Sequence, residues 1–426
     1  MPAIANIPVY RVDMSKPAEE RYIQLAKEFA HRIRSVSPLF DEVIASLFGR
    51  KLAGVIKFAS RHALRRVFDA EQTKEIKSIA AVANIGTHLL MSLNLFLDLM
   101  LGCTSGAVLV RPRTGHGDGQ DTKDRLMHFR TLEWGMDALR DLLVIIEFVD
   151  SSKGDIDDVI ATSVSYAGFV GCLTGVRYGL SVSLNFRPTH DCTLTSLTKH
   201  QLLVLLGHRE AVPSILRRIL LNNDLHCSSL EVPVQSGLTA NRSEQSLLSI
   251  TEAAKKFIHL PTSPCYITLC DGFKVVGILK DLYTGKAKAS SLFQVQCNHD
   301  PDHGTCCGHK ANSSPSEATQ NMMIGNDDWL DESETRQRAL ENKWLRHLAA
   351  ATKEAGAEAQ GQGNGLCLDA HTPADFDTCT EVPGVDEAML QQWVKTYPTT
   401  NDYTHFACIM DPASGTIRWI SRGSEP

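Results

Sequence analysis

The chain has 426 residues, 43% of them hydrophobic and 22% charged, which is the composition of a globular protein with room for one large core or two smaller ones. The formal net charge of −6 argues against nucleic acid as the main partner, because binding to phosphate favours a basic surface. The charge is uneven: residues 1–102 hold 14 Lys and Arg against 10 Asp and Glu, and the remainder holds 29 against 39.

The first 22 residues show neither the apolar stretch nor the small-residue cleavage site of a secretory signal. The 12 cysteines are spread along the whole chain instead of forming a compact disulfide framework. We therefore expect a cytoplasmic protein with reduced thiols, most of them small buried side chains.

Residues 17–102 are predicted to be helical. Pro17, followed within three positions by two glutamates, is typical of a helix start. Apolar residues then recur with helical spacing at Leu25, Phe29 and Ile33.

Two stretches of this segment have features of membrane-binding helices. A helix is predicted over 49–68 with its basic residues largely on one side, which we interpret as a solvated face; attraction to an anionic membrane surface is the alternative. The apolar run 85–101 is interrupted by His88, Asn94 and Asp98 and is shorter than the roughly 20 residues that span a bilayer. We interpret it as a buried helix, with a lipid-facing helix near a substrate entrance as the alternative.

At Cys103 the pattern changes to short apolar runs bounded by Gly, Asp or Ser, which indicates strands. Strands, then helices, then strands favour a mixed α+β layer architecture. The segments 300–327 and 351–365 are predicted to be poorly ordered, the second because it is rich in Gly, Ala and Gln. The predicted strands are 106–110, 126–133, 142–149, 163–169, 180–186, 265–269, 273–279, 293–297, 405–410 and 416–420, and the helices are 197–207, 212–222 and 245–258.

The switch from helical to strand-rich sequence coincides with Gly102 and Cys103. A thiolate at this junction can attack the preceding carbonyl, convert the amide to a thioester and let water release the upstream segment, and glycine permits the strained backbone that this step needs. Cys103 would then carry an α-amine with a reference pKa of about 8, suited to act as general base for its own thiol. The alternative is a structural cysteine.

Patches distributed over nearly the whole chain carry a more specific signal. They are Ile-Pro-Val-Tyr-Arg-Val-Asp at 7–13, Pro-Ala-Glu-Glu-Arg at 17–21, Cys-Thr-Ser at 103–105, Tyr-Ala-Gly-Phe-Val-Gly-Cys-Leu-Thr-Gly at 166–175, and Gly-Leu-Ser-Val-Ser-Leu-Asn at 179–185. In this order they resemble the acid ceramidase and N-acylethanolamine-hydrolysing acid amidase family of cysteine N-terminal-nucleophile hydrolases, which is related to bile-salt and penicillin V hydrolases.

The resemblance implies a division of the chain at Gly102–Cys103. Residues 1–102 would be a helical α-subunit or pro-segment, and residues 103–426 a catalytic β-subunit with a four-layer αββα core. Self-cleavage would produce an α/β heterodimer in which the helical segment stays packed against the core.

The same resemblance assigns roles to several residues. The nucleophile corresponds to Cys103. The family's Arg-Asn-x-Asp patch corresponds to residues 130–133, so that Arg130 helps shape the acyl site and Glu133 holds the α-amine and the nucleophile. Glu133 is one methylene longer than the family's aspartate.

Asn298 corresponds to an asparagine that donates to the oxyanion, a contribution of about 3 kcal/mol to the barrier. The family's later arginine corresponds to Arg336, with Arg338 as the competing choice. Phe186 stands where acid ceramidase has a glutamate, which weakens the case for ceramide as the substrate and for an acidic optimum. Asn185, just before it, corresponds to an asparagine of the bile-salt hydrolases and is a second candidate for the oxyanion hole.

Structural interpretations of these residues remain open at this point. Arg130 and Glu133 fit an ordinary surface ion pair, and Asn298 fits a turn cap with Asp300. Glycines of the patch 166–175 fit turn and close-packing positions. His, Asp and Cys residues between 299 and 309 are dense enough for zinc, but their spacing fits no four-ligand pattern, so we expect a polar loop, no metal and no cofactor.

We therefore predict an amidase that hydrolyses a small N-acyl amide (a fatty-acyl amide, a ceramide-like amide or an amide of specialised metabolism) through a Cys103 thioester. The alternatives are an N-acyltransferase or amide synthase that uses the same thioester, and an inactive homologue that binds a lipid or another partner, with peripheral membrane contact. A lysosome-like or vacuolar compartment is the alternative to the cytoplasm.

Overall fold

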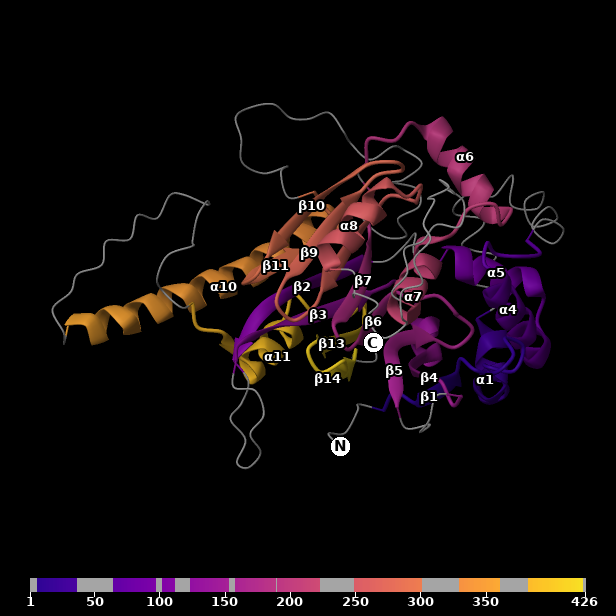
Figure 1. Cartoon of the computed structure of the whole chain (residues 1–426), viewed down its shortest axis with the longest axis horizontal. Coiled ribbons are helices and arrows are strands. Elements are labelled where there is room, and N and C mark those ends of the chain that lie inside the picture. Colours follow the sequence, from indigo (N-terminus) through magenta and orange to yellow (C-terminus); the bar gives the residue numbers. More distant parts are fainter. Residues whose placement is uncertain are drawn as a thin grey trace, which may run out of the picture.

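The computed structural model of the chain describes residues 6–36, 64–96, 102–111, 123–152, 158–188, 190–222, 249–300, 329–360 and 382–423. Within these residues two β-sheets are stacked face to face, and helices cover the outer side of each sheet (Figure 1). The four layers confirm the predicted α+β class and its αββα architecture.

The larger sheet has eight strands in the order β1-β4-β5-β6-β7-β8-β9-β10. Neighbouring strands are antiparallel except β1, which pairs in parallel with β4. We had expected the core to be formed by residues 103–426 alone. This expectation is wrong for the larger sheet, because β1 lies upstream of the predicted junction. The strands are β1 (Val9–Asp13), β4 (Leu143–Val149), β5 (Val159–Tyr166), β6 (Thr174–Arg177), β7 (Leu180–Phe186), β8 (Cys265–Cys270), β9 (Val275–Lys280) and β10 (Gly285–Ser290).

The smaller sheet has six strands in the order β11-β2-β3-β13-β14, with β12 also paired to β2. Nearly every residue of β2, β3 and β13 is buried, because one face of the sheet meets the larger sheet and the other meets helices. The strands are β2 (Gly102–Arg111), β3 (Arg125–Glu133), β11 (Phe293–Gln296), β12 (Val385–Asp386), β13 (Thr404–Asp411) and β14 (Thr416–Arg422).

Helices from both sides of the predicted junction cover the larger sheet, and together they share one apolar core with it. Two other helices, α10 and α11, pack on the outer face of the smaller sheet. The helices are α1 (Ile23–Ser35), α4 (Ala70–Ala83), α5 (Thr87–Phe96), α6 (Leu194–Leu205), α7 (Val212–Asn222), α8 (Ile250–His259), α10 (Trp329–Gln360) and α11 (Glu387–Lys395), and a 3-10 helix spans Asp137–Leu142.

Helix α1 buries Leu25, Phe29 and Ile33, as their spacing predicts. It begins six residues later than predicted, because Pro17 opens a turn in which its carbonyl accepts the N–H of Glu20 at 2.9 Å. Most of the predicted helix 49–68 lies outside the described residues, and 64–68 are not helical.

Helix α5 confirms a helix in the apolar run 85–101 as far as Phe96, and residues 97–101 lie outside the described part. In the described part of the chain, no helix has the length and apolar character needed to cross a membrane.

The remaining differences concern ends and short strands. The prediction that 351–365 is poorly ordered is wrong for 351–360, because α10 continues through these Ala- and Glu-rich residues, which favour helix. The predicted strand 163–169 is displaced: β5 ends at Tyr166, where Gly168, with φ of +99°, turns the chain. The strands β1, β6, β10 and β12 had not been predicted.

Candidate active site

Cys103 is the second residue of β2, an inner strand of the smaller sheet between β11 and β3, and is fully buried. Side chains alternate between the two faces of a strand. Cys103 and Ser105 face the larger sheet, where Ser105 Oγ lies 3.0 Å from Asn185 Oδ1 on β7. Thr104 faces α10, and its Oγ1 accepts a hydrogen bond from Arg336 Nε at 3.1 Å. The predicted junction therefore borders both the inter-sheet layer and the layer of α10.

Arg130 lies in the inter-sheet layer beside the thiol. Its Nη2 donates to Cys103 Sγ at 2.9 Å and to the Leu184 carbonyl at 2.6 Å, and its Nη1 donates to Asn185 Oδ1. The side chain is fully buried. The interpretation of Arg130 as part of a surface ion pair is therefore wrong, and its guanidinium group is placed to stabilise negative charge on the sulfur.

Asn185 connects strands of the two sheets. Its Nδ2 lies 2.9 Å from the Gln296 carbonyl, 3.2 Å from the Cys297 carbonyl and 3.4 Å from the Cys103 carbonyl. Since this amide group faces three backbone carbonyls and its oxygen accepts from Arg130, Asn185 fixes the strands around the nucleophile. In this state it presents no donor to an oxyanion.

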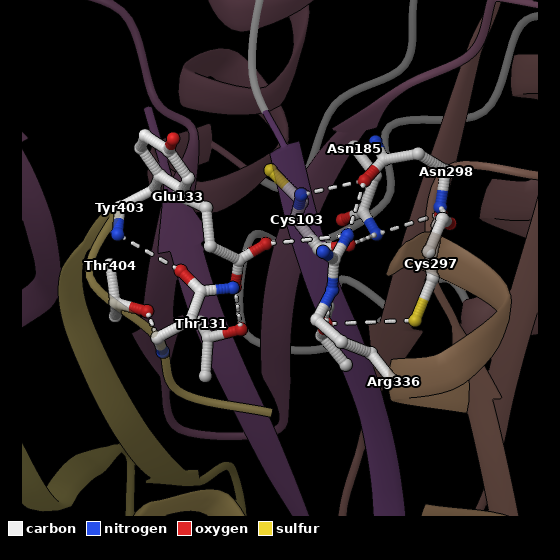
Figure 2. Close-up of polar contacts among 12 residues, drawn as sticks. Cys103, Thr131, Glu133, Asn185, Cys297, Asn298, Arg336, Tyr403 and Thr404 are labelled. Atoms are coloured by element: carbon white, nitrogen blue, oxygen red, sulfur yellow. Dashed lines mark hydrogen bonds and ion pairs between the residues drawn. The ribbon is translucent and has the colours of Figure 1, made fainter. Parts of the chain in front are cut away.

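Asn298 holds the backbone nitrogen of Cys103. Its Oδ1 accepts the N–H of Cys103 at 2.7 Å (Figure 2). Its Nδ2 donates to the Phe186 carbonyl at 2.8 Å. Arg336 Nη2 also lies 3.3 Å from Oδ1, which agrees with an oxygen at this position. The Nδ2 group of Asn298, which we expected to donate to the oxyanion, thus donates to the Phe186 carbonyl instead. The group directed at the junction is its Oδ1, which is an acceptor. The turn-cap interpretation does not describe these contacts.

Arg336 lies between Asn298 and Glu133, as Figure 2 shows. Besides its contacts with Thr104 and Asn298, its Nη2 is 3.5 Å from Glu133 Oε2, and both side chains are about 5% exposed. Arg338 instead forms an i,i+4 pair with Glu334 and is 68% exposed. Of the two arginines left open by the sequence, the structure brings Arg336 to the junction.

Glu133 is the cross-strand partner of Gly102. Its Oε1 accepts a hydrogen bond from Thr131 Oγ1, whereas Oε2 makes no hydrogen bond within the described residues. A Cβ atom added at Gly102 would lie 3.3 Å from Glu133 Cβ and 3.5 Å from Oε2. The carboxylate therefore lies beside Gly102 at the predicted junction, and Thr131 holds one of its two oxygens.

The surroundings of Cys103 favour the neutral thiol over the thiolate. Burial raises its pKa to about 12. Arg130 and Arg336 lower this pKa by their positive charge, and Glu133 raises it. Attack by the sulfur consequently requires a base that removes its proton.

Two polar residues of the site had not been identified from the sequence. Thr131 orients Glu133, and its position between Arg130 and Glu133 was the available signal. Ser333, on α10, accepts the backbone N–H of Asn298 at 2.8 Å and lies 2.9 Å from His299 Nδ1. No local sequence feature links Ser333 to a loop 35 residues upstream.

Among the described residues, no group of three or more His, Cys, Asp or Glu side chains is arranged to hold a metal ion. Of the cluster considered for zinc, His299 contacts Ser333 and Asp300 pairs with Arg187. Its other members, from 302 to 309, lie outside the described residues.

Cys103 thus stands at the start of an inner strand in a four-layer αββα fold, and polar side chains contact both its nitrogen and its sulfur. Parts of the chain are similar to known proteins. Residues 5–68 match the family model described as the beta subunit of N-acylethanolamine-hydrolyzing acid amidase. The description of this family model names a β subunit, whereas we had expected residues 1–102 to form an α-subunit because of their resemblance to the start of that subunit in the family.

Several acid ceramidases are similar in sequence. That of Pan troglodytes is 26% identical over 197 residues and that of Homo sapiens 24% over 196, each match covering 42% of this chain and 46% of the relative. That of Bos taurus is 25% identical over 243 residues, covering 51% and 54%. The chain is similar over part of its length to acid ceramidases and, at residues 5–68, to the family model of N-acylethanolamine-hydrolyzing acid amidase. It spans about half the length of the curated relatives it matches.

A solved structure, that of the Caenorhabditis elegans ortholog of N-acylethanolamine-hydrolyzing acid amidase, aligns with 76% of this chain and 100% of its own. The TM-score is 0.43 and the sequence identity 17%.

Proposed function

We propose that the chain cleaves itself between Gly102 and Cys103 and then hydrolyses the amide bond of a small N-acyl amide. The observation that supports this proposal is that Cys103 makes two hydrogen bonds with polar side chains. Its N–H donates to Asn298 Oδ1 at 2.7 Å, and its sulfur accepts from Arg130 Nη2 at 2.9 Å. A structural cysteine needs neither contact.

Self-cleavage starts with attack of Cys103 Sγ on the carbonyl carbon of Gly102. The C–N bond breaks, the nitrogen takes the thiol's proton and becomes an amine, and water hydrolyses the thioester to leave a carboxylate on Gly102. Asn298 Oδ1, which lies 2.7 Å from the nitrogen of Cys103, is then an acceptor for the new amine. Glu133 lies beside Gly102, and Arg336 contacts both of these side chains.

Turnover repeats this chemistry on a substrate. The amine accepts the thiol proton, the sulfur attacks the amide carbonyl, the amine product leaves with that proton, and water resolves the acyl thioester. Arg130 stabilises the thiolate. The oxyanion role that the resemblance gives to Asn298 would require its side chain to turn from Phe186, and remains a prediction.

The names of the relatives include ceramide and N-acylethanolamines, so the substrate class we propose is a lipid amide. Phe186, in place of a glutamate, removes a charge near the site and favours a neutral amine portion over a charged one.

A panel of N-acyl amides, assayed at acidic and neutral pH with Cys103→Ala as the control, tests the activity. We expect release of the free fatty acid by the unchanged protein and none by the variant. Equal turnover by both would contradict the proposal. If added amines yield N-acylated products in place of the acid, the protein is an acyltransferase; turnover by neither protein would favour the inactive homologue.

A further inference from the structure

The loop that carries Asn298 is joined to the end of β7 by three successive contacts. Asn185 Nδ2 donates to the Cys297 carbonyl at 3.2 Å, and Asn298 Nδ2 donates to the Phe186 carbonyl at 2.8 Å. The third contact pairs Arg187 with Asp300 through two hydrogen bonds, of 2.9 Å from Nε and 2.7 Å from Nη2. Residues 185–187, at the end of β7, are thus joined to residues 297–300, which follow β11.

The Arg187–Asp300 pair has the geometry of a fixed contact. Arg187 is 6% exposed, and its remaining Nη1 donates to Asp281 Oδ1 at 2.8 Å. Asp300 also accepts a hydrogen bond from Tyr266 OH at 2.7 Å, and the guanidinium carbon of Arg187 lies 5.5 Å from the centre of the Tyr266 ring. A bidentate arginine–carboxylate pair constrains orientation more than a single hydrogen bond does.

These contacts determine where Asn298 can place its amide. Asp300 is two residues beyond Asn298, and the backbone N–H of Asn298 is held from the opposite side by Ser333 of α10. If Arg187 is removed, Asp300 loses two of its donors, and the loop keeps its attachment to α10 but loses the charged contact with β7. A displacement of about 1 Å at a catalytic group can cost roughly 10²-fold in rate.

We propose that Arg187 is a positioning residue, which acts through Asp300 to hold Asn298 Oδ1 against the nitrogen of Cys103. This inference rests on the proposed function. It concerns an arginine that touches neither the sulfur nor the nitrogen of Cys103 in the structure.

The test compares Arg187→Gln, Arg187→Lys and Asp300→Asn with a matched control, Arg217→Gln. Arg217 is also a buried arginine with a bidentate carboxylate partner, Glu75, but it lies on α7, and this partner belongs to α4 and not to the loop of Asn298. Self-cleavage is followed on gels, turnover by kcat and KM, and stability by thermal unfolding.

We expect Arg187→Gln and Asp300→Asn each to lower the rate of self-cleavage and kcat by about 10²-fold, with little change in KM. The variant that combines Arg187→Gln with Asp300→Asn should be no slower than either single variant, because both act on the same contact. Arg187→Lys, which keeps the charge, should recover part of the rate. Asn298 Oδ1, as an acceptor, stabilises the protonated α-amine and so raises its pKa. Loss of the contact between Asn298 Oδ1 and the amine should therefore lower this pKa and move the acidic limb of the kcat/KM profile to lower pH. Arg217→Gln should lower the melting temperature without these effects.

Equal rates and pH profiles for Arg187→Gln and Arg217→Gln would overturn the positioning role while leaving the proposed function intact. Turnover that survives Cys103→Ala would overturn the proposed function itself. If Arg187→Gln does not fold, Asp300→Asn and Arg187→Lys decide the question by the same criteria.

Discussion

The charges around Cys103 act on its sulfur in opposite directions. Arg130 touches the sulfur and Arg336 lies nearby, and both lower the pKa of the thiol, whereas Glu133 raises it. The same carboxylate lies beside Gly102, the residue that precedes the amine of the proposed cleaved form. Glu133 therefore disfavours the thiolate, and in the proposed cleaved form it would favour the protonated amine.

This opposition gives a prediction for alkylation of the uncleaved protein, collected before self-cleavage. Glu133→Gln should make Cys103 react faster at a given pH, because its pKa falls and the thiolate fraction rises by about tenfold per pKa unit. Arg130→Gln should make it react more slowly.

Peptide mass spectrometry after a timed alkylation pulse measures these rates at several pH values. Cys270 serves as the internal control, since neither Glu133 nor Arg130 contributes to the shift of its pKa. Slower alkylation of Cys103 in Glu133→Gln would show that the carboxylate does not act on the sulfur as the structure indicates.

The choice between Arg336 and Arg338 shows what the sequence contained at this scale. On α10 the buried residues Ser333, Arg336, Leu340 and Trp344 follow helical spacing, and Arg338 falls on the exposed side. The helical spacing of the buried residues was therefore the sequence signal that could have distinguished Arg336 from Arg338. The acceptor role of Asn298 had no such signal, because it depends on a loop between two sheets.

At the scale of elements, residues 1–102 are attached to the rest of the chain by strand pairing and by a buried ion pair between side chains. Strand β1 pairs with β4, and Glu75 of α4 forms a bidentate pair with Arg217 of α7. Arg21 Nη1 adds a contact to Glu75 at 3.0 Å. Glu75 and Arg217 are both buried, so replacing Glu75 leaves the charge of Arg217 without its carboxylate partner, at a cost of about 3 kcal/mol or more.

Glu75→Gln is accordingly expected to weaken the association of residues 1–102 with residues 103–426 after cleavage. Size-exclusion chromatography in increasing urea measures the separation of the two fragments. Glu71→Gln is the matched control on the same helix, because Glu71 is 66% exposed and shares only Arg21 with this cluster. Equal urea midpoints for both variants would contradict a role of the buried pair in holding the fragments together.

Most elements downstream of Cys103 were predictable, because buried strands leave runs of apolar residues. Strand β10 was not, since its residues are largely exposed and include two lysines, and its place follows only from pairing with β9. Strand β1 was missed for a related reason: it lies at the edge of the sheet, and its partner is more than 100 residues away.

At the scale of the whole molecule, the site exists only where the two sheets and α10 meet. Cys103 and Glu133 come from neighbouring strands of the smaller sheet, Asn185 from the larger sheet, Asn298 from a loop, and Arg336 from α10. The sequence identified these residues through their resemblance to a family, and the structure brings them together. Their distances and donor directions depend on the packing of layers and could not be predicted from local patterns.

The central claim is tested most directly by the covalent state of active protein, determined by intact mass and N-terminal sequencing. We predict two fragments, residues 1–102 and 103–426, the second beginning with Cys-Thr-Ser, and a single unbroken chain for Cys103→Ala. Preparations that hydrolyse an N-acyl amide while the chain remains unbroken between Gly102 and Cys103 would contradict the account.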